Sequence, residues 1–241
     1  MLLKFRGIVL HHIDYGETSL ILHLYTDQKG RISVIIPGAR GKRKNKKISL
    51  YHNLALLDLE VYYKASRDLQ QIREARPVIP MPGLTGDPVK STMALFLSEI
   101  LYRTLKEEEA NPELFSFLEN AITYFELAGE GVANLHIYIL IHLTRFLGFF
   151  PDINQKNDSI WFDMKAARFT NFPPETPNRV DPSISGLLAA FLNSGLDETI
   201  AIKLSRNQRS ELIEALLVYY RTHLPEMGEI RSYPVLRAIF D

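Results

Sequence analysis

Hydrophobic and polar side chains alternate along several short segments in the first third of the chain. Residues 20–25 carry Leu at every second position, and residues 31–36 alternate again after a turn that contains Gly30. A strand, a Gly-containing turn and a second strand predict a β-hairpin. Residues 57–63 alternate apolar with acidic and aromatic side chains, which predicts a half-buried strand. The first and last strands are expected at 5–13 and 69–75.

About five short strands in so few residues favour a small closed barrel, because closure leaves no unpaired strand edge. The stretch PVIPMPGLTGDP, at 77–88, then carries four Pro and two Gly residues. That composition continues neither a strand nor a helix. We therefore expect a barrel domain at 1–78 and a Pro/Gly linker at 79–88.

Beyond the linker, apolar residues recur every three to four positions, which is the period of an α-helix. Asn111 followed by Pro112 predicts the start of one helix. Residues 132–149 are apolar almost all round, which predicts the most buried helix. Ser205 with Gln208 predicts a capping box at the start of another. The expected fold class is α+β with several domains: a small β-barrel followed by an all-helical domain at 89–241.

One part of the expected helical domain does not follow the helical pattern. Residues 151–182 are rich in Pro, Asn and Asp, and they predict an irregular insertion. One hairpin is expected within it, around Trp161, Phe162 and Phe169.

The chain has no net charge, yet its charges are unevenly distributed. Residues 1–76 hold 14 Lys and Arg against 7 Asp and Glu, a balance of +7, and residues 77–241 have a balance of −7. Such asymmetry points to nucleic acid or another acidic partner for the basic part. Much of the excess lies in GARGKRKNKKISL at 38–50, where eight positions hold six basic residues: Arg40, Lys42, Arg43, Lys44, Lys46 and Lys47.

The basic stretch has two interpretations. A charge run often only solvates a loop, whereas on a positively charged barrel it can contact the phosphates of a nucleic acid. We favour the second interpretation. An aromatic neighbour could stack on bases, and the candidates are Tyr25, Tyr51 and Tyr62. Tyr51 flanks the basic stretch and is the one we retain, because Tyr62 shares its strand face with carboxylates and Tyr25 with apolar residues.

The sequence lacks the residues that several kinds of chemistry require. The chain has no Cys, so disulfides, thiol nucleophiles and cysteine-bound zinc are excluded. His11 and His12 face opposite sides of a strand, and His136 and His142 lie on different faces of a helix. We therefore expect no metal, no cofactor and no enzyme activity. The N-terminus does not resemble a signal peptide, and no apolar window is long enough for a membrane helix.

The stretch GIVLHHIDYGETSLILHLYTDQKGRISVIIPGARGKR, at 7–43, resembles the start of the RecO family of bacterial recombination mediators. RFLGFFP at 145–151 is similar to the end of that family's central helix, and residues 163–169 are similar to its aromatic-Asp to Arg-Phe stretch. Many members carry a four-cysteine zinc module after the central helix. This chain has no Cys at 153–182, so the segment must be held by packing instead.

The resemblance implies an OB fold for the barrel and binding of both single- and double-stranded DNA. It also implies annealing of complementary strands and loading of a recombinase onto strands coated with single-strand binding protein. The implied partners are RecR and the acidic, apolar C-terminal tail of single-strand binding protein, and the implied location is the cytoplasm, at the nucleoid. Arg31 and the basic stretch from Arg40 are the matching DNA-contact positions. Arg103 and Arg145 are candidates for holding the tail.

Two other interpretations stay open at this point. An RNA-binding OB protein would have the same pattern, because nothing in the sequence distinguishes contacts to the ribose 2′-OH. A hydrolase or nuclease would need clustered carboxylates, which the sequence does not display.

Overall fold

The computed structural model describes residues 1–39, 49–129, 131–152, 161–175 and 177–240. The chain divides into two compact units. Unit 1 comprises Met1–Leu127 and Ile230–Leu236, and unit 2 comprises Ala128–Glu229 and Arg237–Asp241. The predicted change from strands to helices falls between 77 and 82, whereas the division between the units falls later in the chain.

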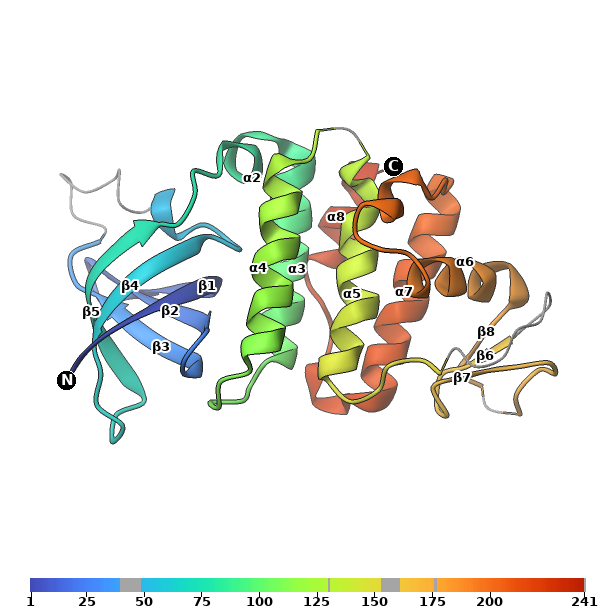
Figure 1. The fold of residues 1–241 in the computed structure, drawn as a ribbon, viewed down its shortest axis with the longest axis horizontal. Coiled ribbons are helices and arrows are strands. Elements are labelled where there is room, and N and C mark those ends of the chain that lie inside the picture. The colour runs from blue at the N-terminus through green and yellow to red at the C-terminus, as the bar shows by residue number, and fades with distance from the viewer. Residues whose placement is uncertain (40–48, 130, 153–160, 176, 241) are drawn as a thin grey trace. The chain divides into compact units, whose positions relative to one another are not determined.

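Unit 1 begins with a closed barrel in the strand order β1-β2-β3-β5-β4 (Figure 1). Its strands are β1 (Leu2–Tyr15), β2 (Ser19–Thr26), β3 (Gly30–Ile36), β4 (Leu56–Tyr62) and β5 (Leu69–Pro77), with the 3-10 turn η1 (Ser49–Tyr51) before β4. The β3–β5 pairing is parallel and the other pairings are antiparallel. This closure is that of an OB-type barrel, so the predicted fold is confirmed.

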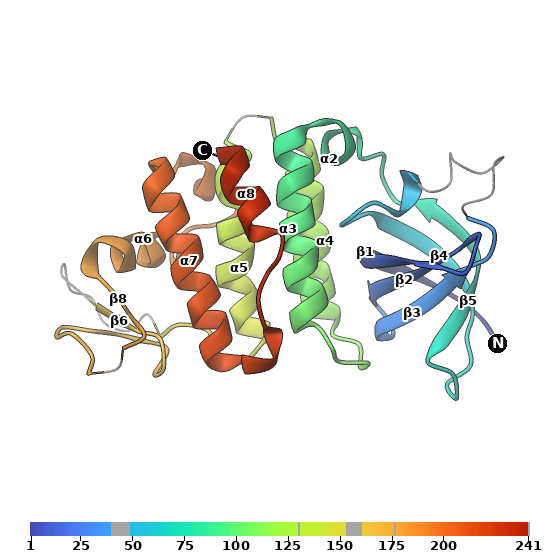
Figure 2. The ribbon, with the colours of Figure 1, turned by 180° about the vertical axis from the view of Figure 1, so that it is seen from behind.

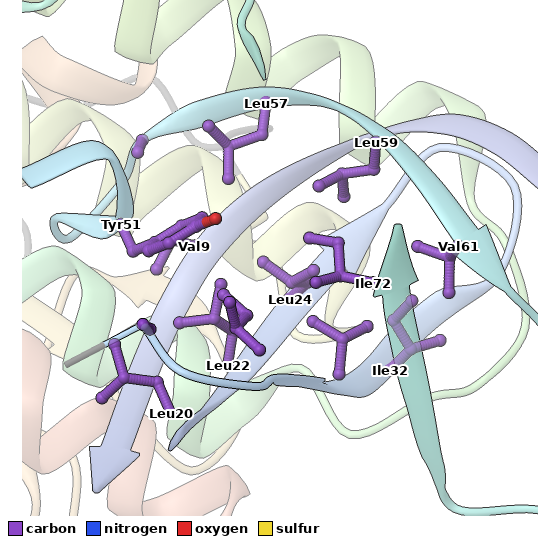
Figure 3. Packing of buried hydrophobic residues seen from close by; sticks show 14 of the residues in the cluster. Val9, Leu20, Leu22, Leu24, Ile32, Tyr51, Leu57, Leu59, Val61 and Ile72 are labelled. Carbon is purple, nitrogen blue, oxygen red and sulfur yellow. The ribbon is translucent and has the colours of Figure 1, made fainter. Parts of the chain in front are cut away.

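The apolar side chains at every second strand position form the barrel interior. Val9, Leu22, Leu24 and Val34 are fully buried, and they point into one cluster with Leu57 (Figure 3). Each such side chain contributes roughly 1.5–3 kcal/mol when it leaves water. A shift of one residue in any strand would turn these side chains outward, so the cluster fixes the register of the strands.

In unit 1 the barrel is followed by α2 (Pro82–Gly86), α3 (Pro88–Thr104) and α4 (Pro112–Leu127). The starts of α3 and α4 follow the expected chemistry, with Pro in the first helical position and a capping side chain before it. Asp87 accepts hydrogen bonds from the backbone N–H groups of Val89 and Lys90, and Asn111 accepts one from Leu114.

The β2–β3 hairpin is joined to the loop between α3 and α4. Gly30 has φ +56°, and a Cβ on it would lie 2.4 Å from the carbonyl oxygen of Glu109 and 2.6 Å from that of Glu107. The next residue, Arg31, donates its backbone N–H to the Glu107 carbonyl at 2.9 Å. Only Gly combines this backbone angle with so close an approach. The hairpin and the end of α3 therefore form one seat, which we call the Gly30 seat.

Unit 2 is mostly helical (Figure 2). The predicted helix at 132–149 is divided into a 3-10 turn, η2 (Val132–Asn134), and a helix, α5 (Leu135–Phe146). The predicted capping box of Ser205 and Gln208 is present at the start of α7 (Arg206–His223). The remaining elements after α5 are α6 (Pro182–Leu192), η3 (Glu198–Ala201) and η4 (Pro225–Met227), and α8 (Tyr233–Phe240) ends the described chain.

The insertion forms a small sheet in the order β7-β6-β8, from β6 (Trp161–Asp163), β7 (Arg168–Thr170) and β8 (Arg179–Val180). Phe162 and Phe169 are buried, with ring centroids 5.0 Å apart, and Phe162 contacts Tyr219 of α7 edge to face at 5.2 Å. His223 of α7 also bonds to the Met164 carbonyl at 2.7 Å. Aromatic packing thus holds this small sheet against α7.

Replacing Gly30 should destabilise unit 1 by more than the strain of a left-handed backbone at a residue other than Gly. Gly16 is the matched control, because its φ of +58° is similar but nothing lies within 4 Å of a Cβ built on it. Gly16→Ala should cost roughly 1–2 kcal/mol from the left-handed backbone alone. Gly30→Ala should cost on the order of 3 kcal/mol or more, because backbone atoms must also move. Urea unfolding followed by circular dichroism measures both; equal losses would contradict the seat.

Candidate nucleic-acid interface

The outer face of the β2–β3 hairpin is where OB folds commonly bind oligonucleotides. In unit 1 the end of α3 covers much of this face. The Tyr102 ring lies 4.8 Å from His11, 5.2 Å from His23, and 4.3 Å from the Arg31 guanidinium carbon. A strand of nucleic acid therefore has to reach this barrel at its margins rather than across the middle of this face.

Arg31 has a structural role in this arrangement. One guanidinium nitrogen donates to the carbonyls of Tyr102 at 2.9 Å and Leu105 at 3.2 Å, at the C-terminal end of α3. A cation at this end satisfies carbonyls that have no partner inside the helix and complements the helix dipole. The predicted DNA contact of Arg31 stays a prediction, and the side chain already has these partners.

Beside Arg31 lies an open cavity of about 260 Å³, which we call the cationic cleft. Its cations come from separate segments: Lys29 from the β2–β3 turn, Arg31 from β3, Arg67 from the β4–β5 loop, and Lys106 from the loop after α3. Tyr63 is the aromatic residue in the lining, and Asp68 and Glu108 also line it. Four cations against two carboxylates leave a positive excess that suits a phosphate.

The buried Gln70 side chain fixes the β4–β5 loop that forms one wall of this cleft. Its amide oxygen accepts from the Lys64 N–H at 2.8 Å, and its amide nitrogen donates to the carbonyls of Lys64 and Arg67. The ammonium of Lys29 lies over the Tyr63 ring, 5.2 Å from its centroid. Burial of Gln70 makes these bonds costly to lose, so the positions of Tyr63 and Arg67 are set before a ligand arrives.

Along β1, β4 and β5, the outer surface of the barrel pairs its cations with carboxylates. The pairs are Lys4–Glu60 at 2.7 Å, Arg6–Glu119 at 2.7 Å, Arg73–Glu60 at 3.1 Å and Arg76–Glu74 at 2.8 Å. The hydrogen bond from Lys4 is the main cause that lowers the pKa of Glu60. This mixed surface offers a polyanion no net attraction.

The basic stretch continues from the other end of β3. The cleft lies at the start of β3, and residues 37–48 follow its last residue, Ile36. Seven strand residues separate these ends by roughly 20 Å. Arg40, Lys42, Arg43, Lys44, Lys46 and Lys47 lie outside the described residues.

Tyr51 is a core residue, which corrects its expected role in base stacking. Its ring is 5% exposed and packs among the interior side chains of the barrel (Figure 3). A ring in that position presents no face to a base. Tyr25 is also buried, which raises its pKa to about 12, whereas Tyr62 is 50% exposed on the acidic strand β4.

The two arginines proposed for a peptide partner have different surroundings. Arg103 lines a largely apolar groove of about 380 Å³ in unit 1, with Leu95, Val235 and a second cation, Arg231. Glu99 also lines this groove, where it accepts from the backbone N–H groups of Arg231 and Ser232 and pairs with Arg103 at 3.4 Å. In unit 2, Arg145 is exposed at the end of α5 and lies over the Phe150 ring at 4.6 Å.

Comparison with known proteins identifies the family. The sequence profile described as "Recombination protein O N terminal" matches residues 1–81, and "Recombination protein O C terminal" matches 85–232. This chain belongs to the recombination protein O family. It is 34% identical to "DNA repair protein RecO" of Bacteroides fragilis, 31% to that of Flavobacterium johnsoniae and 30% to that of Azobacteroides pseudotrichonymphae, each over 100% of both chains. The resemblance of residues 7–43 to RecO is thus confirmed.

Two further observations concern other kinds of site. No helix in the described parts of this RecO-family chain is both long enough and apolar enough to cross a membrane. Among the same residues, no group of three or more His, Asp or Glu side chains is arranged to hold a metal ion.

Sequence reasoning missed three of the cations of the cleft. Lys29, Arg67 and Lys106 stand alone in separate loops, so no run of charge marks them. The available signal was indirect: Lys29 and Arg67 lie in the turns that flank the predicted strands, and OB folds commonly use the β4–β5 loop in binding.

His23 should make the protein less stable in acid. Burial, with Arg31 and His11 nearby, lowers its pKa from 6.5 to about 4. Between these values the unfolded chain binds a proton that the folded chain does not, so stability falls as pH drops from about 6.5 to about 4. His23 is only partly buried, so the loss should be at most about 1–2 kcal/mol. His23→Gln should remove this part of the decline.

The measurement is the free energy of unfolding in urea at pH 7 and pH 4.5 for both proteins. Other groups, including the fully buried His136 with its pKa lowered to about 3, contribute equally to both and cancel in the difference. Identical declines in the two proteins would show that His23 is not responsible.

Proposed function

We propose that this RecO-family protein is a non-catalytic DNA-repair mediator that binds single- and double-stranded DNA and anneals complementary strands. The observation that carries the proposal is the placement of the cationic cleft at one end of β3, on the strand whose other end leads into the basic stretch. The cleft and β3 belong to an OB-type barrel, and the relatives named above are DNA repair proteins.

Annealing follows from charge neutralisation. Cations that contact the phosphates of two strands reduce the repulsion between the strands and release their counterions. Holding both strands on one protein also raises their local concentration. Base pairing then supplies the free energy, so no catalytic group is required. This mechanism accounts for a site that contains cations and a Tyr ring but no cluster of catalytic side chains.

The groove beside Arg103 fits the acidic, apolar tail of single-strand binding protein. Its wall offers Leu95 and Val235 to the apolar tip, and Arg103 and Arg231 to the carboxylates. Contact with that tail would bring the DNA-binding barrel to coated strands, which is the first step in loading a recombinase. RecR is the further partner that we propose from the family, and a role on the bacterial chromosome would place the protein in the cytoplasm.

The salt dependence of DNA binding tests the barrel sites. A fluorescent single-stranded oligonucleotide is titrated with the wild type and with three variants, each at several salt concentrations from 50 to 200 mM. A loop variant changes Lys42, Arg43, Lys44, Lys46 and Lys47 to Ala, and a cleft variant changes Lys29, Arg67 and Lys106 to Ala. The matched control changes the carboxylate-paired Lys4, Arg73 and Arg76 to Ala.

Each lost phosphate contact should flatten the slope of log K against log salt by about 0.7. We expect the slope to flatten by about 3.5 units in the loop variant and by about 2 units in the cleft variant. The paired control should change little. Wild-type behaviour of both test variants would overturn the proposed interface, and a competing RNA of the same sequence shows whether DNA is preferred.

The groove is tested with a short acidic peptide that ends in an apolar residue and a free carboxylate. Arg103→Gln and Arg231→Gln should each weaken its binding roughly tenfold, because each removes a charge-assisted hydrogen bond. Isothermal titration calorimetry measures the affinities, with Arg145→Gln as the control. If Arg145→Gln alone weakens binding, the tail docks on α5 instead.

A further inference from the structure

The small sheet of unit 2 has two faces of different character. Its inner face carries Phe162, Phe169 and Val180, which are buried. Because side chains alternate along a strand, Trp161 on the central strand belongs to the other face, where it is partly exposed. Its cross-strand neighbour on β7 is Thr170. Trp161 is the only Trp in the chain.

One cation lies over this Trp, and a second lies on the neighbouring strand. The Arg179 guanidinium carbon lies 5.6 Å from the centre of the Trp161 ring, and the Arg179 side chain is held there by a hydrogen bond to the Pro174 carbonyl at 3.1 Å. Arg168 and Arg179 lie on either side of Asp163 in the strand register. One oxygen of Asp163 accepts from the N–H groups of Lys165 and Ala166 in the adjoining turn.

A further apolar side chain lies close by in the sequence. Phe172, two residues beyond β7, is 80% exposed. Its carbonyl accepts a hydrogen bond from the Thr170 hydroxyl at 2.8 Å, which ties this stretch to the end of the strand. Among the described residues, the inner aromatic cluster of Phe162, Phe169 and Tyr219 includes neither Phe172 nor Trp161.

An antiparallel sheet that presents an aromatic ring, with arginines beside it, is an established design for stacking unpaired bases. Here the inner aromatic packing against α7 holds the sheet in place. We propose that the outer face of the β7-β6-β8 sheet is a second single-stranded DNA site, with Trp161 stacking on a base and Arg168 and Arg179 contacting phosphates. This inference rests on the proposed DNA-binding function, and it adds a site away from the barrel.

The two sites differ in how they attract DNA. The barrel site depends on many cations, so its affinity falls steeply with salt. The sheet has two arginines against Asp163, and stacking supplies most of its affinity, so its salt slope should be shallow, at about −1. A protein with both sites could hold one strand on the sheet through its bases and another strand on the barrel through its phosphates.

Tryptophan fluorescence tests the sheet directly, because Trp161 is the only source of this emission. The full chain is titrated with an unlabelled single-stranded oligonucleotide, and emission is recorded with selective excitation of Trp. In parallel, anisotropy of a labelled copy of the oligonucleotide reports total binding. Stacking should quench the emission with the same midpoint as the rise in anisotropy.

Variants separate stacking from folding. Trp161→Ala should lower the affinity roughly 5- to 100-fold, the range for one stacked base, whereas Trp161→Phe keeps a ring and should retain most of it. The control is Tyr62→Ala, which removes an exposed aromatic ring from a strand that carries Asp58 and Glu60. It should bind like the wild type.

The two readouts distinguish the failure of each proposal. Anisotropy that reports binding while the Trp161 emission stays constant would overturn the sheet site and leave the barrel interface standing. No binding by either readout would overturn both. Equal affinity of Trp161→Ala and the wild type would also exclude stacking at this face.

Discussion

The Gly30 seat, in which the β2–β3 hairpin contacts the end of α3 and the loop after it, determines which surfaces of the barrel remain accessible to a ligand. The left-handed Gly30 lets the hairpin approach the backbone of Glu107 and Glu109 closely, and Arg31 then caps the last carbonyls of the helix. Those bonds bring Tyr102 over the strand face that OB folds commonly use. The helical part of unit 1 therefore does more than support the barrel, because it moves the accessible cations to the margin, where the cationic cleft forms.

Ion pairs also divide the barrel surface into a part whose cations are paired and a part with an excess of positive charge. Along β1, β4 and β5, carboxylates lie within ion-pair distance of Lys4, Arg73 and Arg76. Around the cleft, cations from loops outnumber carboxylates. A chain with zero net charge can therefore still present one surface that attracts a polyanion, since attraction over a Debye length of about 8–10 Å depends on local rather than total charge.

The sequence predicted those features that depend on local pattern. Alternation identified the strands, because each strand of a barrel turns one face to the solvent and the other to the core. The caps at Asn111 and Ser205 could be predicted because capping involves only residues close in sequence. Features that depend on closure were not readable. Lys29, Arg67 and Lys106 meet only after the barrel has closed and α3 has packed on it. No local pattern shows that the core encloses Tyr51, which was assigned to DNA. Nor does any local pattern show that a helix end engages Arg31, whose DNA contact stays a prediction.

The small β7-β6-β8 sheet shows how very short strands depend on side-chain packing. Strands of two or three residues make few ladder hydrogen bonds, and the burial of Phe162, Phe169 and Tyr219 between the sheet and α7 supports them. Trp161 lies on the outer face of this sheet, so it contributes nothing to the aromatic cluster of the inner face. Its position beside Arg179 is therefore better explained by a ligand that stacks than by the stability of the sheet.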